Sequence, residues 1–138
     1  MNHTDRTPRP LLFVALLSLV LSFTACQRAQ AAPKAEPVEA AALLAQINAG
    51  TAPLVIDVRT ADEYAAGHVP GAVNIPYDQM PVRAAEIAVH KDKEVVLYCR
   101  SGRRSGIAAE TLAAEGFTGL RLLVGDMPGW ERAGYPVE

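Results

Sequence analysis

The clearest structural signal in this chain lies in residues 94–105, which are Glu94-Val95-Val96-Leu97-Tyr98-Cys99-Arg100-Ser101-Gly102-Arg103-Arg104-Ser105. The apolar, β-branched residues at the start predict a short strand, and the alanine-rich run 107–114 that follows predicts a helix. Cys99 therefore lies on a strand-to-helix turn. Such a turn directs backbone N–H groups and the positive end of the helix into its concavity, which favours a thiolate over a thiol.

The charge of this turn supports a reactive Cys99. Arg100, Arg103 and Arg104 place three permanent positive charges within five positions, with no acidic neighbour in the turn. A thiolate is a working nucleophile, whereas a thiol is a poor one. The pattern favours a nucleophilic Cys99 over the alternative, a buried structural cysteine beside a solvated basic turn.

Helical and strand patterns alternate along the rest of the domain. Short connections with right-handed crossovers then predict an α/β fold, a small parallel sheet with helices on both faces. A capping box of Thr60 and Glu63 marks the start of the second helix. We expect strands over 54–58, 72–76, 94–98 and 120–124, and helices from 38 to about 50, over 61–66, 82–89, 104–115 and 127–133.

Ligands bind beyond the carboxyl ends of the strands in open parallel sheets. Three segments lie at such ends, namely residues 59–63, the Cys99 turn and residues 125–127. We expect these segments to meet at one edge of the domain.

The N-terminus carries a targeting pattern. Residues 1–25 combine Arg6 and Arg9 with a leucine-rich run, which predicts a signal peptide. The setting of Cys26 resembles the lipobox of bacterial lipoproteins, so we expect lipidation there, with export to the periplasm and a membrane anchor. A cleaved soluble form and an uncleaved anchored form are the alternatives. Residues 26–37 predict a tether and residues 38–138 one domain.

Composition narrows the function further. The chain of 138 residues has a formal net charge of −2 and two cysteines, so a lipidated Cys26 leaves Cys99 as the only free thiol. The basic residues cluster only at the Cys99 turn, which predicts no nucleic-acid binding. His3, His68 and His90 have no ligand spacing, so we expect no metal site. We also expect a monomer.

The number of residues in the turn argues against a cysteine phosphatase. Four residues separate Cys99 from Arg104, whereas those enzymes need five to encircle a phosphate. Position 105 is serine rather than arginine, and Tyr98 stands where they commonly carry histidine. A phosphatase is therefore the least favoured hypothesis.

The turn resembles the six-residue active-site loop of the single-domain rhodaneses, the thiosulfate-type sulfurtransferases. The likeness extends over residues 38–138. One departure is Gly125-Asp126, where that family often has two glycines, and an acidic residue there could disfavour an anionic donor. The other matching segments are Ile56-Asp57-Val58-Arg59, Glu63-Tyr64, Gly67-His68-Val69-Pro70-Gly71-Ala72, Asn74-Ile75-Pro76, Trp130 and Ala133-Gly134-Tyr135-Pro136-Val137.

The resemblance implies a five-stranded parallel sheet with flanking helices and a sulfur-transfer activity without a cofactor. Cys99 would attack the outer sulfur of a donor such as thiosulfate and become a persulfide. A thiol or cyanide acceptor would then take that sulfur. A binding or sensing module that captures sulfane sulfur or an oxyanion without turnover is the alternative, because it needs the same nucleophile.

The resemblance also implies roles for the other residues of the site. Backbone N–H groups from Arg100 through Ser101, Gly102 and Arg103 to Arg104 would hold the thiolate and the persulfide. Arg100 and Arg103 would guide the oxyanions of the donor, and Arg104 would brace the loop unless it is a solvated helix-end charge. Asp57 and Arg59 would support the site, with Arg59 paired to Glu63 or Asp62 rather than touching substrate. His68 is expected to be a hydrogen-bonded turn residue and Trp130 a core anchor.

Overall fold

The computed structural model describes Met1 and residues 34–138. Apart from Met1, the predicted signal peptide lies outside the described residues, and so do Cys26 and the part of the tether before Lys34. These assignments stay predictions. In the part of the chain that is described, no helix has the length and hydropathy that crossing a membrane requires.

Five parallel strands form one sheet, as predicted. The strands are β1 Glu36–Val38, β2 Leu54–Asp57, β3 Val73–Asn74, β4 Glu94–Tyr98 and β5 Gly119–Leu123. Their order across the sheet is β1-β5-β4-β2-β3, so β4 lies at the centre and carries the Cys99 turn at its carboxyl end.

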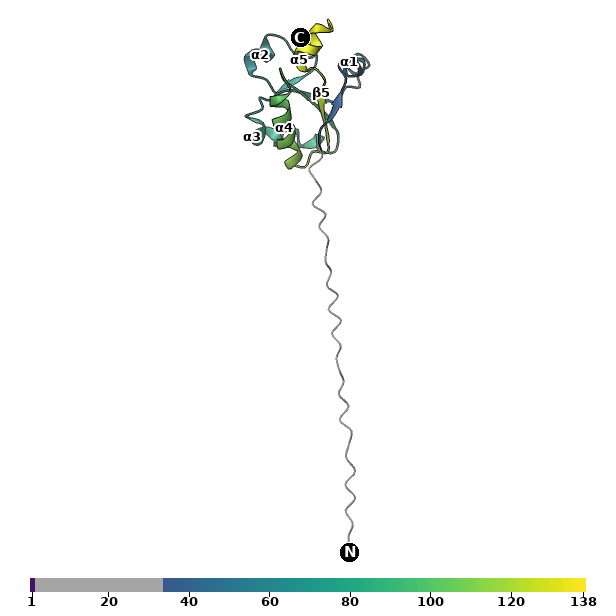
Figure 1. Cartoon of the computed structure of the whole chain (residues 1–138), viewed down its shortest axis with the longest axis vertical. Coiled ribbons are helices and arrows are strands. Elements are labelled where there is room, and N and C mark those ends of the chain that lie inside the picture. The colour runs from purple at the N-terminus through teal and green to yellow at the C-terminus, as the bar shows by residue number, and fades with distance from the viewer. Residues whose placement is uncertain (2–33) are drawn as a thin grey trace.

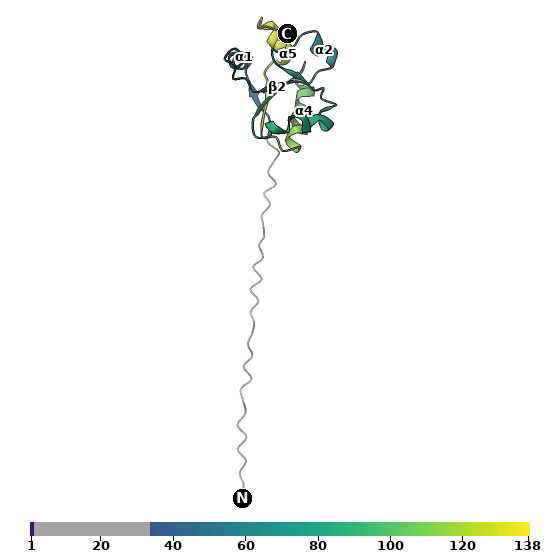
Figure 2. The same ribbon diagram turned by 180° about the vertical axis from the view of Figure 1, so that it is seen from behind.

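Helices cover both faces of this sheet. They are α1 Ala40–Asn48, α2 Ala61–Ala65, α3 Met80–Arg83, the 3₁₀-helix η1 Ala84–His90, α4 Arg103–Ala114 and α5 Asp126–Arg132. Helices α3, η1 and α4 pack on one face, and α1 and α5 pack on the other. Figures 1 and 2 show the sheet between α4 and α1 from opposite sides.

The side chains of β4 show why a continuous apolar run forms a strand here. Val95 and Leu97 join the core under α3 and α4, whereas Val96 and Tyr98 join the core under α1 and α5. Successive side chains of a strand point to opposite faces, so a strand covered on both faces must be apolar at every position. Cys99 continues the alternation into the first core.

Strand β3 is shorter than the expected 72–76, and α1 begins at Ala40 rather than at 38. Two further elements differ more from the expectations. Strand β1 begins at Glu36, inside the predicted tether, because an edge strand of three residues is held by its backbone pairing with β5 and needs no apolar pattern. The helix expected over residues 82–89 is instead α3 followed by η1. Ile87 has non-helical dihedral angles of −111° and 15°, which interrupt it.

The chain enters the sheet at the amino ends of the strands, opposite to the carboxyl ends where Cys99 lies. Glu36 pairs with Arg121, which pairs with Val96, so Lys34 lies level with the start of β4. At the rise of a strand, Cys99 is about 16 Å farther along. In Figure 1, α2 and α5 mark the end of the domain where the carboxyl ends of their preceding strands lie.

Gly119 is expected to tolerate no side chain. A β-carbon there would overlap the backbone carbonyl oxygen of Lys93, which cannot move out of the way as the end of a flexible side chain can. Gly119→Ala should therefore lower the free energy of unfolding in urea by about 1–3 kcal/mol. Gly106→Ala is the control, because a β-carbon there would meet no described atom outside its own helix within 4 Å, and it should stabilise by up to about 1 kcal/mol. Equal effects of the two substitutions would contradict the steric explanation.

Candidate active site

The Cys99 turn forms as the sequence indicates, between β4 and α4. Gly102 caps the helix with a φ of 81°, a conformation that favours glycine. Cys99 is fully buried, and its Sγ accepts a hydrogen bond from the Gly102 N–H at 3.2 Å. Ser101 is exposed and Gly102 half-buried. The thiol thus lies beneath the loop at the positive end of α4.

Ser105 is a site residue that the sequence analysis missed. It is 1% exposed, and its Oγ lies 3.5 Å from the Sγ of Cys99 and donates to the carbonyl oxygen of Gly102 at 3.1 Å. A polar residue in the first helical turn, on the side that faces the strand, is the signal that could have revealed it.

The turn after β5 holds the peptide groups of Cys99. The carboxylate Oδ1 of Asp126 accepts the Cys99 N–H at 2.8 Å, and the N–H of Met127 donates to the Cys99 carbonyl oxygen at 3.1 Å. This contact, together with that of Arg104 to α2 described next, confirms that the three segments after β2, β4 and β5 meet at one edge.

Arg104 binds Glu63 through two hydrogen bonds of 2.6 and 2.8 Å. Glu63 also forms the expected capping box with Thr60. The hydrogen bond from Arg104 is the largest influence, and with Thr60 it lowers the pKa of Glu63 to about 2. The pKa of Arg104 is raised chiefly by Glu63, with a smaller contribution from Cys99. This pair joins the first turn of α4 to α2, so Arg104 braces the loop.

Arg100 and Arg103 differ from Arg104 in their surroundings. Both are exposed, and within the described residues neither forms an ion pair or a side-chain hydrogen bond. Guanidinium groups can donate hydrogen bonds to a planar or tetrahedral oxyanion, and these two stand on the loop that covers the buried thiol.

The predicted partner of Arg59 is wrong. Arg59 pairs with Asp57 at 2.6 Å rather than with Glu63 or Asp62, and it also donates to the carbonyl oxygen of Gly67 at 2.7 Å. Glu63 is occupied by Arg104 and Thr60. The Asp57 side chain also accepts the Arg59 backbone N–H, which brings the two residues together over a short spacing.

This Asp57–Arg59 pair is buried at the carboxyl end of β2, where Asp57 pairs with Tyr98 of β4. Asp57 is 0% and Arg59 7% exposed, and the Arg59 guanidinium lies 5.7 Å from the centre of the Tyr98 ring. Burial opposes the charge on Arg59, but hydrogen bonds and the charge of Asp57 outweigh it and raise its pKa. Burial first, and then the negative Asp57, raise the pKa of Tyr98, which therefore stays neutral.

His68 and Trp130 lie where the sequence analysis expects them. The Nδ1 of His68 is 3.0 Å from the carbonyl oxygen of Tyr64, and its ring stacks on the Tyr64 ring. Trp130 is fully buried, and its Nε1 donates to the carbonyl oxygen of Pro136 at 2.8 Å. Among the described residues, no three His, Cys, Asp or Glu side chains gather as a metal site.

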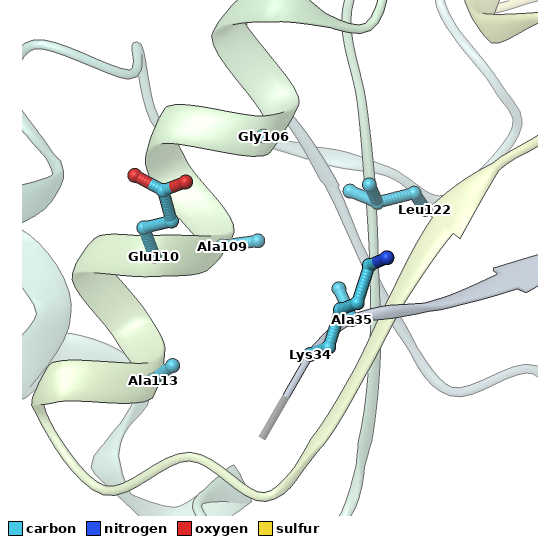
Figure 3. A pocket seen from close by; sticks show the side chains of 7 residues that line it. All are labelled: Lys34, Ala35, Gly106, Ala109, Glu110, Ala113 and Leu122. Carbon is cyan, nitrogen blue, oxygen red and sulfur yellow. The ribbon is translucent and has the colours of Figure 1, made fainter. Parts of the chain in front are cut away.

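Two cavities of the domain lie away from Cys99. One, of about 440 Å³, opens between α4 and the β1–β5 edge, with Lys34 and Glu110 beside small apolar residues (Figure 3). The other, of about 420 Å³, lies between residues 47–55 and residues 70–71.

A buried thiol under an arginine-rich loop, at the carboxyl edge of a five-stranded parallel sheet, defines the class of protein. The chain belongs to the Rhodanese-like domain family, whose sequence model matches residues 39–133. This assignment agrees with the resemblance found in the sequence.

Relatives support the same family. The chain is 40% identical over 84 residues to a "Sulfurtransferase" of Allochromatium vinosum, covering 61% of this chain and 77% of that protein. It is 43% identical over 63 residues to the "Thiosulfate sulfurtransferase PspE" of Escherichia coli, covering 46% of this chain and 61% of PspE.

A solved structure has the same fold. The rhodanese-related protein of Thermoplasma volcanium superposes with a TM-score of 0.61 at 30% identity, covering 75% of this chain and 97% of that one. A rhodanese-like domain with homologues named sulfurtransferases supports sulfur transfer in general.

The Glu63–Arg104 pair predicts a pH-dependent stability. Glu63 has a depressed pKa of about 2 against an ordinary 4.5, so its stabilisation is complete above pH 4.5 and is lost as the pH falls toward 2. The side chains are 28% and 21% exposed, which limits the effect to about 1 kcal/mol. Glu63→Gln should therefore lower the free energy of unfolding at neutral pH and flatten its decline in acid. Asp62→Asn is the control, and an equal effect of that change would contradict a specific Glu63–Arg104 brace.

Proposed function

We propose that this protein is a sulfurtransferase that moves sulfane sulfur from thiosulfate or a similar donor to a thiol or cyanide through a Cys99 persulfide. The observation that carries the proposal is the position of the Cys99 thiol, which accepts the Gly102 N–H at the start of α4, in a loop that also carries the exposed Arg100 and Arg103. Homologues named thiosulfate sulfurtransferases support the choice of donor.

The first half-reaction needs a nucleophile and a leaving group. The Cys99 thiolate attacks the outer sulfur of thiosulfate, a new S–S bond forms, and the old S–S bond breaks with its electron pair on sulfite. The enzyme is left as the Cys99 persulfide anion, so charge and atoms balance. In the second half-reaction an acceptor thiolate or cyanide attacks the outer sulfur and restores the Cys99 thiolate.

The residues around Cys99 contribute binding and positioning. The N–H groups of the loop and of the first turn of α4 would offer hydrogen bonds to a persulfide anion. Arg100 and Arg103 would bind the donor's oxyanions, Arg104 would hold the loop through Glu63, and the Asp57–Arg59 pair would support the carboxyl end of β2 next to β4. None of these steps needs a cofactor.

Mass spectrometry of the intact protein tests the first half-reaction. After incubation with thiosulfate and removal of excess donor, Cys99 should carry the mass of one additional sulfur, and cyanide should remove it. Steady-state turnover with excess thiosulfate and cyanide then separates an enzyme from a capture module, which would stop after one equivalent. No added sulfur would contradict the proposal, and so would aryl phosphate cleavage that depends on Cys99.

Export and lipidation are a separate proposal that rests on residues 1–26. The expressed full chain should fractionate with membranes, and the mature protein should begin at a lipidated Cys26. Cys26→Ser should release it from the membrane fraction. An N-terminus that retains Met1, without lipid on Cys26, would contradict this proposal.

A further inference from the structure

Asp126 has an unusual backbone conformation beside the active-site turn. Among the described residues it is the one non-glycine with a positive φ, at 51°, and it follows Gly125 at 79°. Most L-residues disfavour this region, although aspartate and asparagine adopt it more readily. Such a conformation persists where surrounding contacts hold it.

The contacts of Asp126 are with the active-site turn. Its Oδ1 accepts the backbone N–H of Cys99 at 2.8 Å and lies 3.4 Å from the Oγ of Ser105. The same Ser105 Oγ lies 3.5 Å from the Cys99 Sγ. The carboxylate is therefore less than about 7 Å from the sulfur, close enough for its charge to act on the reaction.

The second carboxylate oxygen faces the loop. A β-carbon on Gly102 would lie 3.5 Å from the Oδ2 of Asp126, and Gly102 is the residue whose N–H holds the thiol. In the described part of the chain Asp126 forms no ion pair, whereas the nearby Glu63 is matched by Arg104. An unmatched negative charge thus stands beside the site that would bind an anionic donor.

We infer that Asp126 is a specificity-determining residue that selects sulfur donors of lower negative charge over dianions such as thiosulfate, while its Oδ1 positions the Cys99 peptide. This inference rests on the proposed function. The positioning role and the selecting role depend on different properties of the Asp126 side chain. Positioning needs an oxygen acceptor at Oδ1, and selection needs the charge.

A pair of donors isolates the charge. Thiosulfate is a dianion, and methanethiosulfonate carries a methyl group in place of one charged oxygen. With either donor the Cys99 thiolate bonds to the outer sulfur, the donor S–S bond breaks, and sulfite or methanesulfinate leaves with the electron pair. The two reactions differ by one unit of charge on the donor.

Asp126→Asn keeps the Oδ1 acceptor and the backbone conformation and removes the charge. We expect it to raise the ratio of kcat/KM for thiosulfate to that for methanethiosulfonate by about 3- to 10-fold at low salt, with a smaller rise at high salt. Asp92→Asn is the control. It removes an exposed charge just before the amino end of β4, the end opposite to Cys99, and should leave the ratio unchanged.

A second measurement does not depend on sulfur transfer. Alkylation by iodoacetate and by iodoacetamide forms the same S–C bond at Cys99 and expels iodide, but the first reagent is an anion and the second is neutral. Asp126→Asn should raise the ratio of the iodoacetate rate to the iodoacetamide rate by a similar factor, with the modified cysteine located by peptide mass spectrometry.

The outcomes separate the two proposals. If both ratios stay unchanged in Asp126→Asn, the inference is wrong even if the wild type transfers sulfur. If the alkylation ratio rises but no donor loads Cys99, the charge effect is supported and the proposed function fails. Asp126→Gly, which removes acceptor and charge together, should lower kcat for both donors, and unchanged kcat would contradict the positioning role.

Discussion

Cys99→Ser is expected to lower thiosulfate:cyanide sulfur transfer by at least about 1,000-fold, because a serine hydroxyl is neither ionised at neutral pH nor able to form a persulfide. The fold should survive, since a hydroxyl in the same place can accept the Gly102 N–H and lies near Ser105. The free energy of unfolding should fall by less than about 2 kcal/mol. Transfer rates and urea unfolding measure the two effects.

The second cysteine provides a matched control. Cys26→Ser in the full chain makes the same chemical change far along the sequence from the active-site turn, and the purified protein should keep its transfer rate. If Cys99→Ser kept most of the activity, or if Cys26→Ser abolished it, the persulfide mechanism proposed for Cys99 would be wrong.

Asp57→Asn is expected to lower the free energy of unfolding by about 3–5 kcal/mol, because it leaves the charge of the buried Arg59 without its partner. For a domain of this size, the melting temperature should fall by about 12 °C or more. Thermal and urea unfolding of the purified variant measure this loss. Transfer activity per folded molecule should change less than stability, since neither side chain contacts the Cys99 Sγ.

The exposed pair Arg83–Glu86 is the control for this prediction. Its side chains are 33% and 55% exposed, so Glu86→Gln should change stability little. The double variant Asp57→Asn/Arg59→Met tests the mechanism, because removing both charges should recover part of the lost stability. A double variant less stable than either single change would contradict an uncompensated charge as the cause.

Local sequence patterns were sufficient for most of the fold. The apolar runs at β2, β4 and β5 identified strands covered on both faces, and the capping box placed α2. Strand β1 could not be found in this way. Its three residues are mostly exposed, and the information that makes them a strand lies in their backbone pairing with β5, far along the chain.

The candidate site was predictable only in part for the same reason. Cys99 and its loop are contiguous in sequence, so their turn could be recognised from a short segment. Which charges pair depends on distances in space. Arg104 binds Glu63 across 41 positions of the sequence. Arg59 therefore pairs with Asp57 instead of with Glu63. The contact of Asp126 with Cys99 likewise spans 27 positions.

The position of β1 determines which side of the domain faces a support. Because the chain reaches the sheet at Lys34, level with the start of β4, any attachment upstream of Lys34 joins the molecule at the edge away from Cys99. A protein fixed to a bead or a sensor chip through its N-terminal segment should therefore present the thiol to the liquid. Reagents, donors and large acceptors should then reach the loop that covers Cys99 without passing between the domain and the surface.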